Sequence, residues 1–301
     1  MKLHILIDNQ PSQTAPELAY EHGLAIYFTV GGKNYLIDTG ASGKFMQNME
    51  QLAGNGVCNP TNVDFTIISH GHNDHTGGLR SFLEGNSLSE VYIHNSVRGN
   101  YFYSCRPKNN VREFRNIGME QALFIDFPHR FINVEEPVSL SEKVSVLPVS
   151  GERKYSVPMG NEFLYQNDFP DNFSHEIAVI AEYASGKYAV ISPCTHNGIL
   201  NVLEHCSGYL HSVKGVAGKE SIGYFIGGLH FVDYLNVPGK EERAEIEAVS
   251  IKETASMILE MYPNLKVISG HCTCQNAGSI LKGILGNSYG TFCSGSMIDC
   301  R

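Results

Sequence analysis

The sequence predicts an α/β protein in which layers of strands and helices are stacked. Short apolar segments rich in Val, Ile, Tyr and Phe alternate with segments of helical periodicity along the 301 residues. Apolar residues make up 42% of the chain, enough for a packed core. No repeat at solenoid spacing and no linker rich in Pro, Gly or Ser interrupts this pattern. We therefore expect a single domain over residues 1–301.

The first third of the chain is predicted to begin with β-strands. The segment VGGKN places two glycines between two β-rich stretches, which is typical of a hairpin turn. The run VDFTIIS is almost wholly apolar, as in a strand buried on both faces. Strands are expected at 3–8, 24–30, 34–40 and 63–69, and helices at 43–53 and from Gly77 onward.

Residues 95–143 are less regular and are predicted to form an insertion or lid. Basic residues outnumber acidic ones between 98 and 130, and the aromatic segment YFYS lies among them. Arginines such as Arg112 and Arg115 would clamp a phosphate or another anion, while the aromatic rings would stack on a flat ligand. A solvated surface loop is the alternative interpretation.

The second half repeats the order of strand, loop and helix. The segment at 241–262 is the longest helix candidate, because apolar residues recur along it at helical spacing. Strands are expected at 144–150, 176–183, 187–193, 221–228, 265–270 and 291–298, and helices at 198–206, 241–262 and 276–285.

Charge and composition exclude several classes of protein. The net charge of −9 argues against a general binder of nucleic acid or of membrane surfaces, which usually presents a basic face. No apolar run approaches the roughly 18 residues of a spanning helix, and the N-terminus does not resemble a secretion signal. The eight cysteines form no CxxC pair and are expected to be reduced. We expect a soluble cytoplasmic protein; a homo-oligomer is compatible with the sequence.

The segment ISHGHNDHTGGL carries the strongest signal for function. His70 and His72 are two residues apart, so on an extended backbone both imidazoles point the same way and reach one ion. Asp74 and His75 follow on a turn and can face a second ion. Imidazole nitrogens with a carboxylate suit Zn²⁺, Mn²⁺ or Fe²⁺. Four such side chains within six residues predict a metal site.

Further histidines follow other predicted strands in the same way. The strand at 187–193 is followed by Cys194 and His196, the strand at 221–228 by His230, and the strand at 265–270 by His271. For each histidine taken alone, a metal ligand and an ordinary loop residue are equally good interpretations. Together they are expected to converge on one rim with the first cluster.

These motifs resemble the metallo-β-lactamase superfamily. SHGHNDHTGG agrees with its His-x-His-x-Asp-His signature, and LIDTG with its Asp-Thr-Gly element. SPCTHNGILN, GGLHF and GHCTC are similar to motifs of the dihydropterin–ribofuranosyl-aminobenzene phosphate synthase-like metal-dependent hydrolases. The resemblance implies a four-layer αββα sandwich with an insertion near 95–143, and a site at one edge of two sheets.

The resemblance also implies a set of site residues. Glu152 stands where many members have a ligand histidine, and Cys194 and His196 stand where many have a bridging aspartate, so His196 is chosen as the replacement ligand. Asp38 is expected to orient a ligand histidine. The expected metal ligands are His70, His72, Asp74, His75, His196 and His271; Asp74 is also the expected catalytic residue, and His230, Arg112 and Arg115 are tentative substrate contacts.

The expected function is that of a metallohydrolase with two divalent ions, preferably zinc with manganese or iron as alternatives. A metal-activated hydroxide would attack a small ester or a phosphate-containing anion, and a pterin-phosphate synthase-like activity is included. A di-iron redox protein and a non-catalytic ligand-binding sensor on the same fold are the alternatives. Neither nucleic acid nor a membrane is an expected partner.

Overall fold

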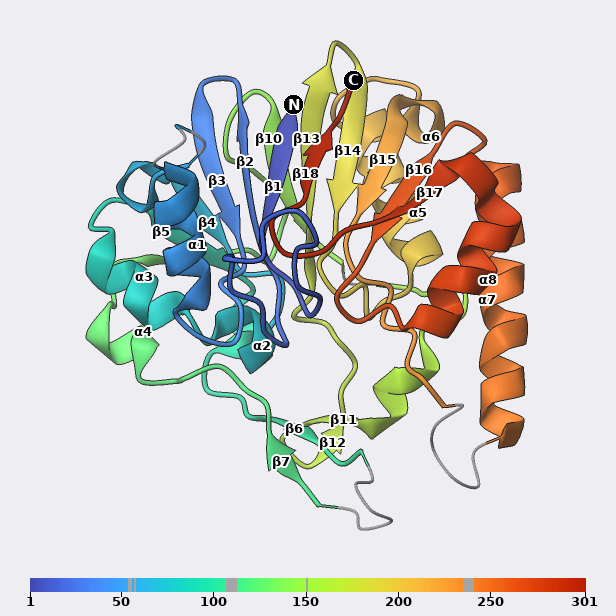
Figure 1. Ribbon diagram of the computed structural model, residues 1–301, viewed down its shortest axis with the longest axis horizontal. Helices are drawn as coiled ribbons and strands as arrows, with labels where there is room; N and C mark the ends of the chain where they lie inside the picture. Colours follow the sequence, from blue (N-terminus) through green and yellow to red (C-terminus); the bar gives the residue numbers. More distant parts are fainter. Residues whose placement is uncertain (54–55, 57, 107–112, 150, 235–240) are drawn as a thin grey trace.

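Two seven-stranded mixed sheets lie face to face between two layers of helices in the described part of the chain (Figure 1). This arrangement is seen in a computed structural model, which describes residues 1–53, 56, 58–106, 113–149, 151–234 and 241–301. The layered α/β prediction is therefore confirmed. No helix among the described residues is long and apolar enough to cross a membrane.

The first sheet has the strand order β18-β1-β2-β3-β4-β5-β8. Strands β1 to β3 are antiparallel, whereas β3, β4, β5 and β8 are parallel. Gly31 and Gly32 form the predicted hairpin turn, and both have positive φ, as a tight two-residue turn requires. The strands are β1 (Lys2–Ile7), β2 (Ala25–Val30), β3 (Lys33–Ile37), β4 (Phe65–Ile67), β5 (Glu90–Ile93), β8 (Phe131–Asn133) and β18 (Met297–Asp299).

The second sheet has the order β17-β16-β15-β14-β13-β10-β9. Strands β14 to β17 are parallel, and β13 runs antiparallel to both β14 and β10. The strands are β9 (Val138–Ser139), β10 (Val144–Pro148), β13 (Ile177–Ala184), β14 (Lys187–Ile191), β15 (Ile222–Ile226), β16 (Lys266–Ser269) and β17 (Tyr289–Thr291).

Alternation along each strand explains why the sheets stack. In β2, Ile26 and Phe28 pack into the core between the sheets, while Tyr27 packs under the outer helices. In β14, Ile191 enters the central core and Val190 the helix-covered one. A strand that supplies two cores must be apolar on both faces, which is why these segments read as continuous apolar runs.

The helices cover the outer faces of the two sheets (Figure 1). Residues of α1, α3 and α4 pack on the first sheet, and residues of α5, α7 and α8 on the second. The helices are α1 (Lys44–Ala53), α2 (Asn73–Thr76), α3 (Leu79–Gly85), α4 (Leu123–Asp126), α5 (Ile199–Ser212), α6 (Gly218–Ser221), α7 (Glu241–Met261) and α8 (Gln275–Leu285), with 3₁₀ turns η1 (Pro60–Asn62), η2 (Asn95–Val97), η3 (Met159–Phe163) and η4 (Gly286–Ser288).

The predicted insertion contributes to a small third sheet at the lower edge of the molecule (Figure 1). Its order is β12-β11-β6-β7, so it joins residues near 102–116 to residues near 164–170. The stretch 95–143 also contains β8 and β9, which extend the two main sheets. The small sheet consists of β6 (Phe102–Ser104), β7 (Arg115–Asn116), β11 (Leu164–Gln166) and β12 (Phe169–Pro170).

The prediction of one last strand over 291–298 is wrong. The chain forms β17 in the second sheet, turns through Gly295 at positive φ, and then forms β18 in the first sheet. Strand β18 pairs with β1, and the Met1 amino group donates to the Cys300 carbonyl oxygen at 2.9 Å. Each of the two strands has only three residues, and Ser294, Gly295 and Ser296 between them are a turn signal that the prediction of one strand overlooked.

Gly77 is expected to be intolerant of any side chain. A Cβ there would lie 2.2 Å from the Ala41 carbonyl oxygen. We expect Gly77→Ala to lower the free energy of unfolding by about 2–3 kcal/mol, because backbone atoms cannot move aside cheaply. Gly283→Ala is the control: a Cβ meets nothing within 4 Å in α8, so this variant should be about 0.5–1 kcal/mol more stable. Urea unfolding measures both, and equal effects would contradict the packing argument.

Candidate metal centre

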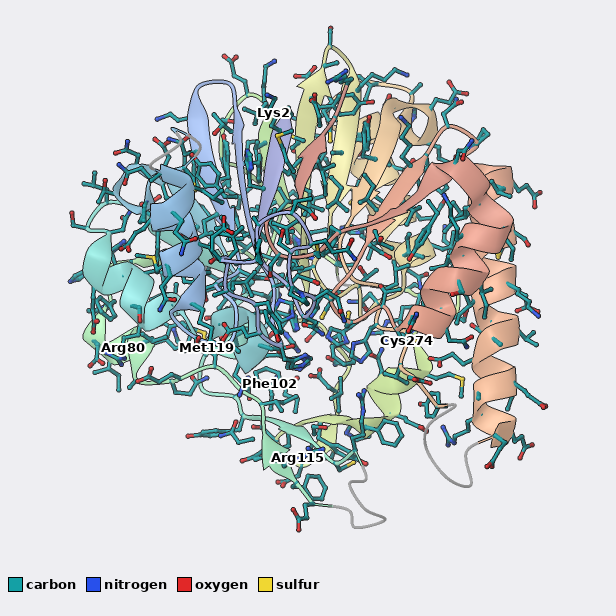
Figure 2. The ribbon with its side chains drawn as sticks, in the orientation of Figure 1. Lys2, Arg80, Phe102, Arg115, Met119 and Cys274 are labelled. Carbon is teal, nitrogen blue, oxygen red and sulfur yellow. The ribbon has the colours of Figure 1, made fainter. Side chains whose placement is uncertain are left out.

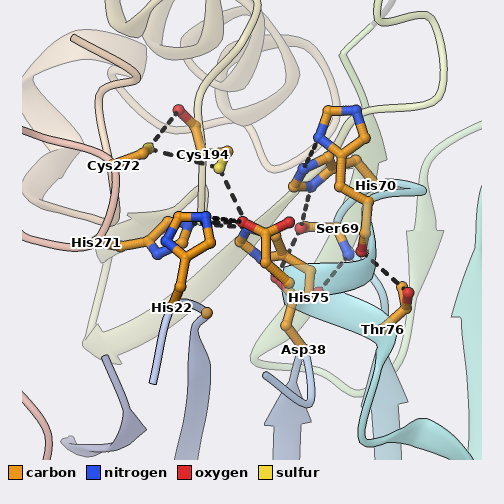
Figure 3. A network of polar contacts seen from close by, with 12 residues as sticks. His22, Asp38, Ser69, His70, His75, Thr76, Cys194, His271 and Cys272 are labelled. Carbon is orange, nitrogen blue, oxygen red and sulfur yellow. Dashed lines mark hydrogen bonds and ion pairs between the residues drawn. The ribbon is translucent and has the colours of Figure 1, made fainter. Parts of the chain in front are cut away.

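All six predicted metal ligands converge at the lower edge of the two main sheets. His70 and His72 follow β4, and Asp74 and His75 lie on the short helix α2. His196 follows β14 and His271 follows β16, so the second sheet approaches the same point from the other side. Figure 3 shows His70, Cys194 and His271 gathered around His75.

Four of the histidines have their Nδ1 atoms hydrogen-bonded to a side chain, which is that of the preceding residue for His70 and comes from a distant segment for the other three. The Ser69 hydroxyl gives its proton to Asp38 Oδ2 and therefore accepts from His70. Asn161 and Asn9 present their amide oxygens to His196 and His271, because their amide nitrogens donate to backbone carbonyl oxygens. With Nδ1 as the donor, each ring turns an Nε2 lone pair toward the centre. The pairs are His70–Ser69 (2.8 Å), His75–Asp38 (2.7 Å), His196–Asn161 (3.0 Å) and His271–Asn9 (3.0 Å).

The first donor group lies between α2 and the loop after β16. His75 Nε2 and His271 Nε2 are 3.0 Å apart, and Asp74 Oδ2 is 3.6 Å from the first and 3.5 Å from the second. Cys194 Sγ is 3.2 Å from His75 Nε2. Zn–N bonds of about 2.0–2.1 Å in a tetrahedron separate the ligand atoms by roughly 3.3 Å. The observed separations bracket that value.

Two facing lone pairs at 3.0 Å repel each other unless a positive charge lies between them. The protons on Nδ1 of His75 and His271 are already donated to Asp38 and Asn9. Either a proton or a metal cation must therefore stand between the two Nε2 atoms. Two nitrogens, a carboxylate oxygen and a sulfur are a donor set that zinc accepts, so these residues fit a divalent cation.

The second donor group is formed by His70, His72 and His196. His70 Nε2 lies 3.1 Å from His72 Nδ1, and ligand atoms of His70, His196 and Cys194 all lie within 4.8 Å of one another. The buried Nε2 atom of His196 has no hydrogen-bond partner. A buried imidazole nitrogen without a partner is costly unless it binds something, so this group also fits a cation.

Burial keeps the histidines of the second group neutral. It lowers the pKa values of His70 and His196 well below the usual range and that of His72 to about 3. Burial alone would raise the pKa of Asp74, but His75 and His271 outweigh it and hold the pKa well below the usual value. Burial would also lower the pKa of His271, but Cys272, Asp74 and Asp8 outweigh it and raise the pKa to about 9. The neutral imidazoles of the second group are ready to bind a cation, whereas His271 must give up a proton to do so.

The backbone is strained where the strands deliver these side chains. Asp38, Thr195, His230 and His271 all have φ between 50° and 60°, in the left-handed region that non-glycine residues rarely adopt. Each follows the end of a main-sheet strand. Strained backbone of this kind is common at functional sites, where the surrounding structure holds it in place. Here the four strained residues lie around the two donor groups.

The tentative substrate contacts lie in different parts of the structure, and only His230 lies beside the histidine cluster. His230 is buried beside His196, with ring centroids 4.2 Å apart, and neither of its ring nitrogens has a partner. Arg115 is exposed on β7 of the small sheet, where its Nη2 donates to the Arg106 carbonyl oxygen (Figure 2). The structure therefore does not bring Arg115 into the histidine cluster. Arg112 lies outside the described residues. Glu152 is exposed and borders a surface depression with Glu204.

Sequence reasoning missed a histidine–aspartate pair that supports the cluster. His175 Nδ1 accepts from the Gly71 backbone N–H at 3.2 Å, and His175 Nε2 donates to Asp171 Oδ2 at 3.0 Å. Glu176 accepts from the backbone N–H of His196 at 2.7 Å. These residues precede β13, which is antiparallel to its neighbours, so its amino end reaches the edge where the other strands end. The signal was the polar DNFSHE segment immediately before a predicted strand.

A second missed residue is His22, which precedes β2 on the loop from β1. Its side chain is 73% exposed, and Nε2 lies 3.4 Å from Asp74 Oδ2. The Leu24 backbone N–H donates to the Asp74 carbonyl oxygen, which ties this loop to α2. His22 therefore extends the candidate site from the Asp74 carboxylate to the protein surface.

Comparison with known proteins agrees with the motifs and the architecture. Residues 21–98 match the family model described as the metallo-beta-lactamase superfamily. The chain is 23% identical over 291 residues to the 7,8-dihydropterin-6-methyl-4-(beta-D-ribofuranosyl)-aminobenzene-5′-phosphate synthase of Methanocaldococcus jannaschii, covering 91% of this chain and 87% of that relative. A 57-residue stretch, 19% of this chain and 26% of the relative, is 42% identical to a probable metallo-hydrolase of the same organism.

A solved structure resembles the whole chain. Tm1679, described as a metal-dependent hydrolase of the beta-lactamase superfamily, superposes with a TM-score of 0.69 at 21% sequence identity. The similarity covers 100% of this chain and 99% of Tm1679. At this identity the similarity concerns the fold, which is the four-layer arrangement expected from the sequence motifs.

Proposed function

We propose that this chain is a member of the metallo-β-lactamase superfamily and a hydrolase that works with two divalent cations. The first cation would be held by His70, His72 and His196. The second would be held by the other predicted ligands, which are Asp74, His75 and His271. Zinc is the preferred ion because Cys194 offers sulfur to both groups, and manganese or iron are less suited to it.

One observation carries the proposal. The Nε2 atoms of His75 and His271 face each other at 3.0 Å while both Nδ1 protons are committed to fixed acceptors. Either a proton or a metal cation lies between the two atoms, and the Asp74 carboxylate and the Cys194 sulfur beside them complete a donor set that favours the metal. A purely structural cluster would instead satisfy each ring nitrogen with a donor or an acceptor.

The chemistry follows from the position of the side chains. A divalent cation, when bound, lowers the pKa of a water molecule and polarises the attacked group. The Asp74 side chain is 18% exposed, whereas those of His75 and His271 are fully buried, so Asp74 is the member that an incoming substrate meets. It is therefore suited to hold or pass a proton at its Oδ2 atom. His230 would contact the substrate with one of its unpartnered ring nitrogens.

The proposed substrate is a small anionic ester or phosphate-containing molecule. The synthase of Methanocaldococcus jannaschii, 23% identical to this chain, is named for a product that carries a 5′-phosphate. A pterin-phosphate synthase-like activity is therefore the more specific form of the proposal. Arg115 on β7 and Arg106, which follows β6, supply positive charge near the lower edge.

Metal analysis joined to an activity assay tests this function. Protein purified without chelator is expected to contain zinc or manganese and to hydrolyse bis(p-nitrophenyl) phosphate, with activity lost on dialysis against a chelator and restored by zinc. Iron accompanied by oxygen consumption would favour the redox alternative. A tightly held ligand without turnover of any ester would favour the sensor and overturn the hydrolase assignment.

A further inference from the structure

Two cysteine sulfurs meet inside the metal centre. Cys194 Sγ and Cys272 Sγ are 3.5 Å apart, and both are free thiols (Figure 3). Cys194 follows β14 and Cys272 follows β16, so the pair joins two loops that each deliver a ligand histidine. The proposed hydrolase uses Cys194 only as a metal donor and leaves Cys272 without a role.

The position of Cys272 is fixed by its surroundings. Gly228 lies so close that a Cβ there would stand 2.4 Å from Cys272 Sγ. The His230 backbone N–H donates to Cys272 Sγ at 3.2 Å, and the Cys272 thiol also lies 3.7 Å from the Cys194 carbonyl oxygen. The sulfur is thus held against Cys194 by contacts on several sides. Cys272 is the more accessible member of the pair, because it is partly exposed whereas Cys194 is buried.

We propose that Cys194 and Cys272 are an oxidative modification site, which closes to a reversible disulfide when the centre lacks its cations. An S–S bond is about 2.05 Å long, so the two sulfurs need to approach by only about 1.5 Å. Rotation of the two side chains supplies such a movement without separating the loops. This inference rests on the proposed metal centre but not on the reaction that the centre catalyses.

The oxidant is a hydroperoxide such as hydrogen peroxide. The Cys272 thiol loses its proton as its sulfur attacks one peroxide oxygen, the O–O bond breaks, and the departing hydroxide takes up that proton, so that a sulfenic acid and one water form. The Cys194 thiol then attacks that sulfur, the S–S bond forms, the S–O bond breaks, and a second water leaves. The two sulfurs lose two electrons in total, and the peroxide gains them. A dithiol reductant reverses the change.

Disulfide formation and metal loading exclude each other. Cys194 Sγ lies in one donor group with His70 and His196 and in another with His75 and His271. A disulfide sulfur carries no thiolate charge, so the bond removes a donor that both groups share. It also draws Sγ away from His75 Nε2, from which it is now 3.2 Å distant. Bound cations would protect the pair, and loss of cations would expose it.

The other cysteines do not share this arrangement in the described part of the chain. Cys206 and Cys300 are buried in two different hydrophobic cores. Cys274, two residues from Cys272, accepts a hydrogen bond from the Ala277 backbone N–H at the start of α8. Cys274 is therefore a matched control, close in sequence but committed to a helix cap.

Peptide mapping of the wild-type protein tests the inference. Chelator-treated protein and zinc-loaded protein are exposed to hydrogen peroxide and then denatured in the presence of iodoacetamide, which blocks the remaining free thiols. Both samples are digested and examined by mass spectrometry. In the chelator-treated sample we expect a peptide that joins Cys194 to Cys272, cleaved by dithiothreitol. The zinc-loaded sample should yield at least about tenfold less of it, and the cross-linked form should bind zinc at least about tenfold more weakly than the reduced form.

Cys272→Ser and Cys274→Ser provide the paired controls. Cys272→Ser should lose the cross-link and retain zinc binding after peroxide, whereas Cys274→Ser should behave as the wild type. The inference is overturned if both thiols remain free in the metal-free wild type, if Cys194 joins another cysteine, or if the cross-linked form binds zinc as well as the reduced form. An inactive protein that still forms the cross-link would contradict the hydrolase assignment alone.

Discussion

The double variant His72→Asn/Asp74→Asn is expected to lose about 10²–10⁴-fold in turnover of a phosphodiester substrate. His72 belongs to one donor group and Asp74 to the other, so the variant weakens both cation sites at once. Asp74 is also the most exposed of the three side chains in its group. Zinc content per chain, measured by mass spectrometry, should fall in parallel with the rate.

The matched control is His129→Asn/Asp168→Asn, which makes the same chemical changes at two exposed positions. It should retain the metal content and the turnover of the wild type. Undiminished turnover in His72→Asn/Asp74→Asn, in protein whose circular dichroism spectrum is unchanged, would show that the reaction does not depend on this centre.

Asp38→Asn is expected to lower zinc affinity by about 10–100-fold and the free energy of unfolding by about 1–3 kcal/mol. Asp38 accepts from the Ser69 backbone N–H, the Ser69 hydroxyl and His75 Nδ1. Asparagine tolerates the positive φ of 58°, so the backbone should not be strained. Its amide nitrogen, however, would face one of these three donors, and the orientation of His75 would be lost. Zinc titration and urea unfolding measure the two effects.

Asp64→Asn is the control for that variant. Asp64 pairs with Lys33 at 2.9 Å on the surface, so the change in stability should stay below about 1 kcal/mol. Zinc affinity should not change. If Asp38→Asn bound zinc as tightly as Asp64→Asn, the role of Asp38 in orienting His75 would be refuted.

Most elements of the fold could be predicted from local patterns. The hairpin at Gly31 and Gly32, the buried strand before His70 and the long helix α7 each follow from turn residues or periodicity. Ser294, Gly295 and Ser296 marked a turn between β17 and β18, but nothing local showed that the chain crosses from one sheet to the other there, because sheet membership is set by pairing with distant strands. The small sheet escaped prediction because its strands β6 and β11 pair segments that are about 60 residues apart.

The candidate site was predictable only where ligands follow strands in the chain direction. His196 and His271 were found by that rule, since parallel strands present their carboxyl ends to one edge. His175 and His22 were missed, because each precedes a strand that runs the opposite way. The orienting partners Asn9 and Asn161 carried no sequence signal, since single asparagines in loops are ordinary.

The sequence by itself determined which side chains can bind metal and that they lie at the ends of buried strands. Both follow from residue chemistry and from periodicity, which are local properties. Only the tertiary structure decided which ring nitrogens face inward, that His75 and His271 meet at 3.0 Å, and that Cys194 touches Cys272. These are distances between segments brought together by the stacking of two sheets, and no local pattern along a chain specifies how such segments meet.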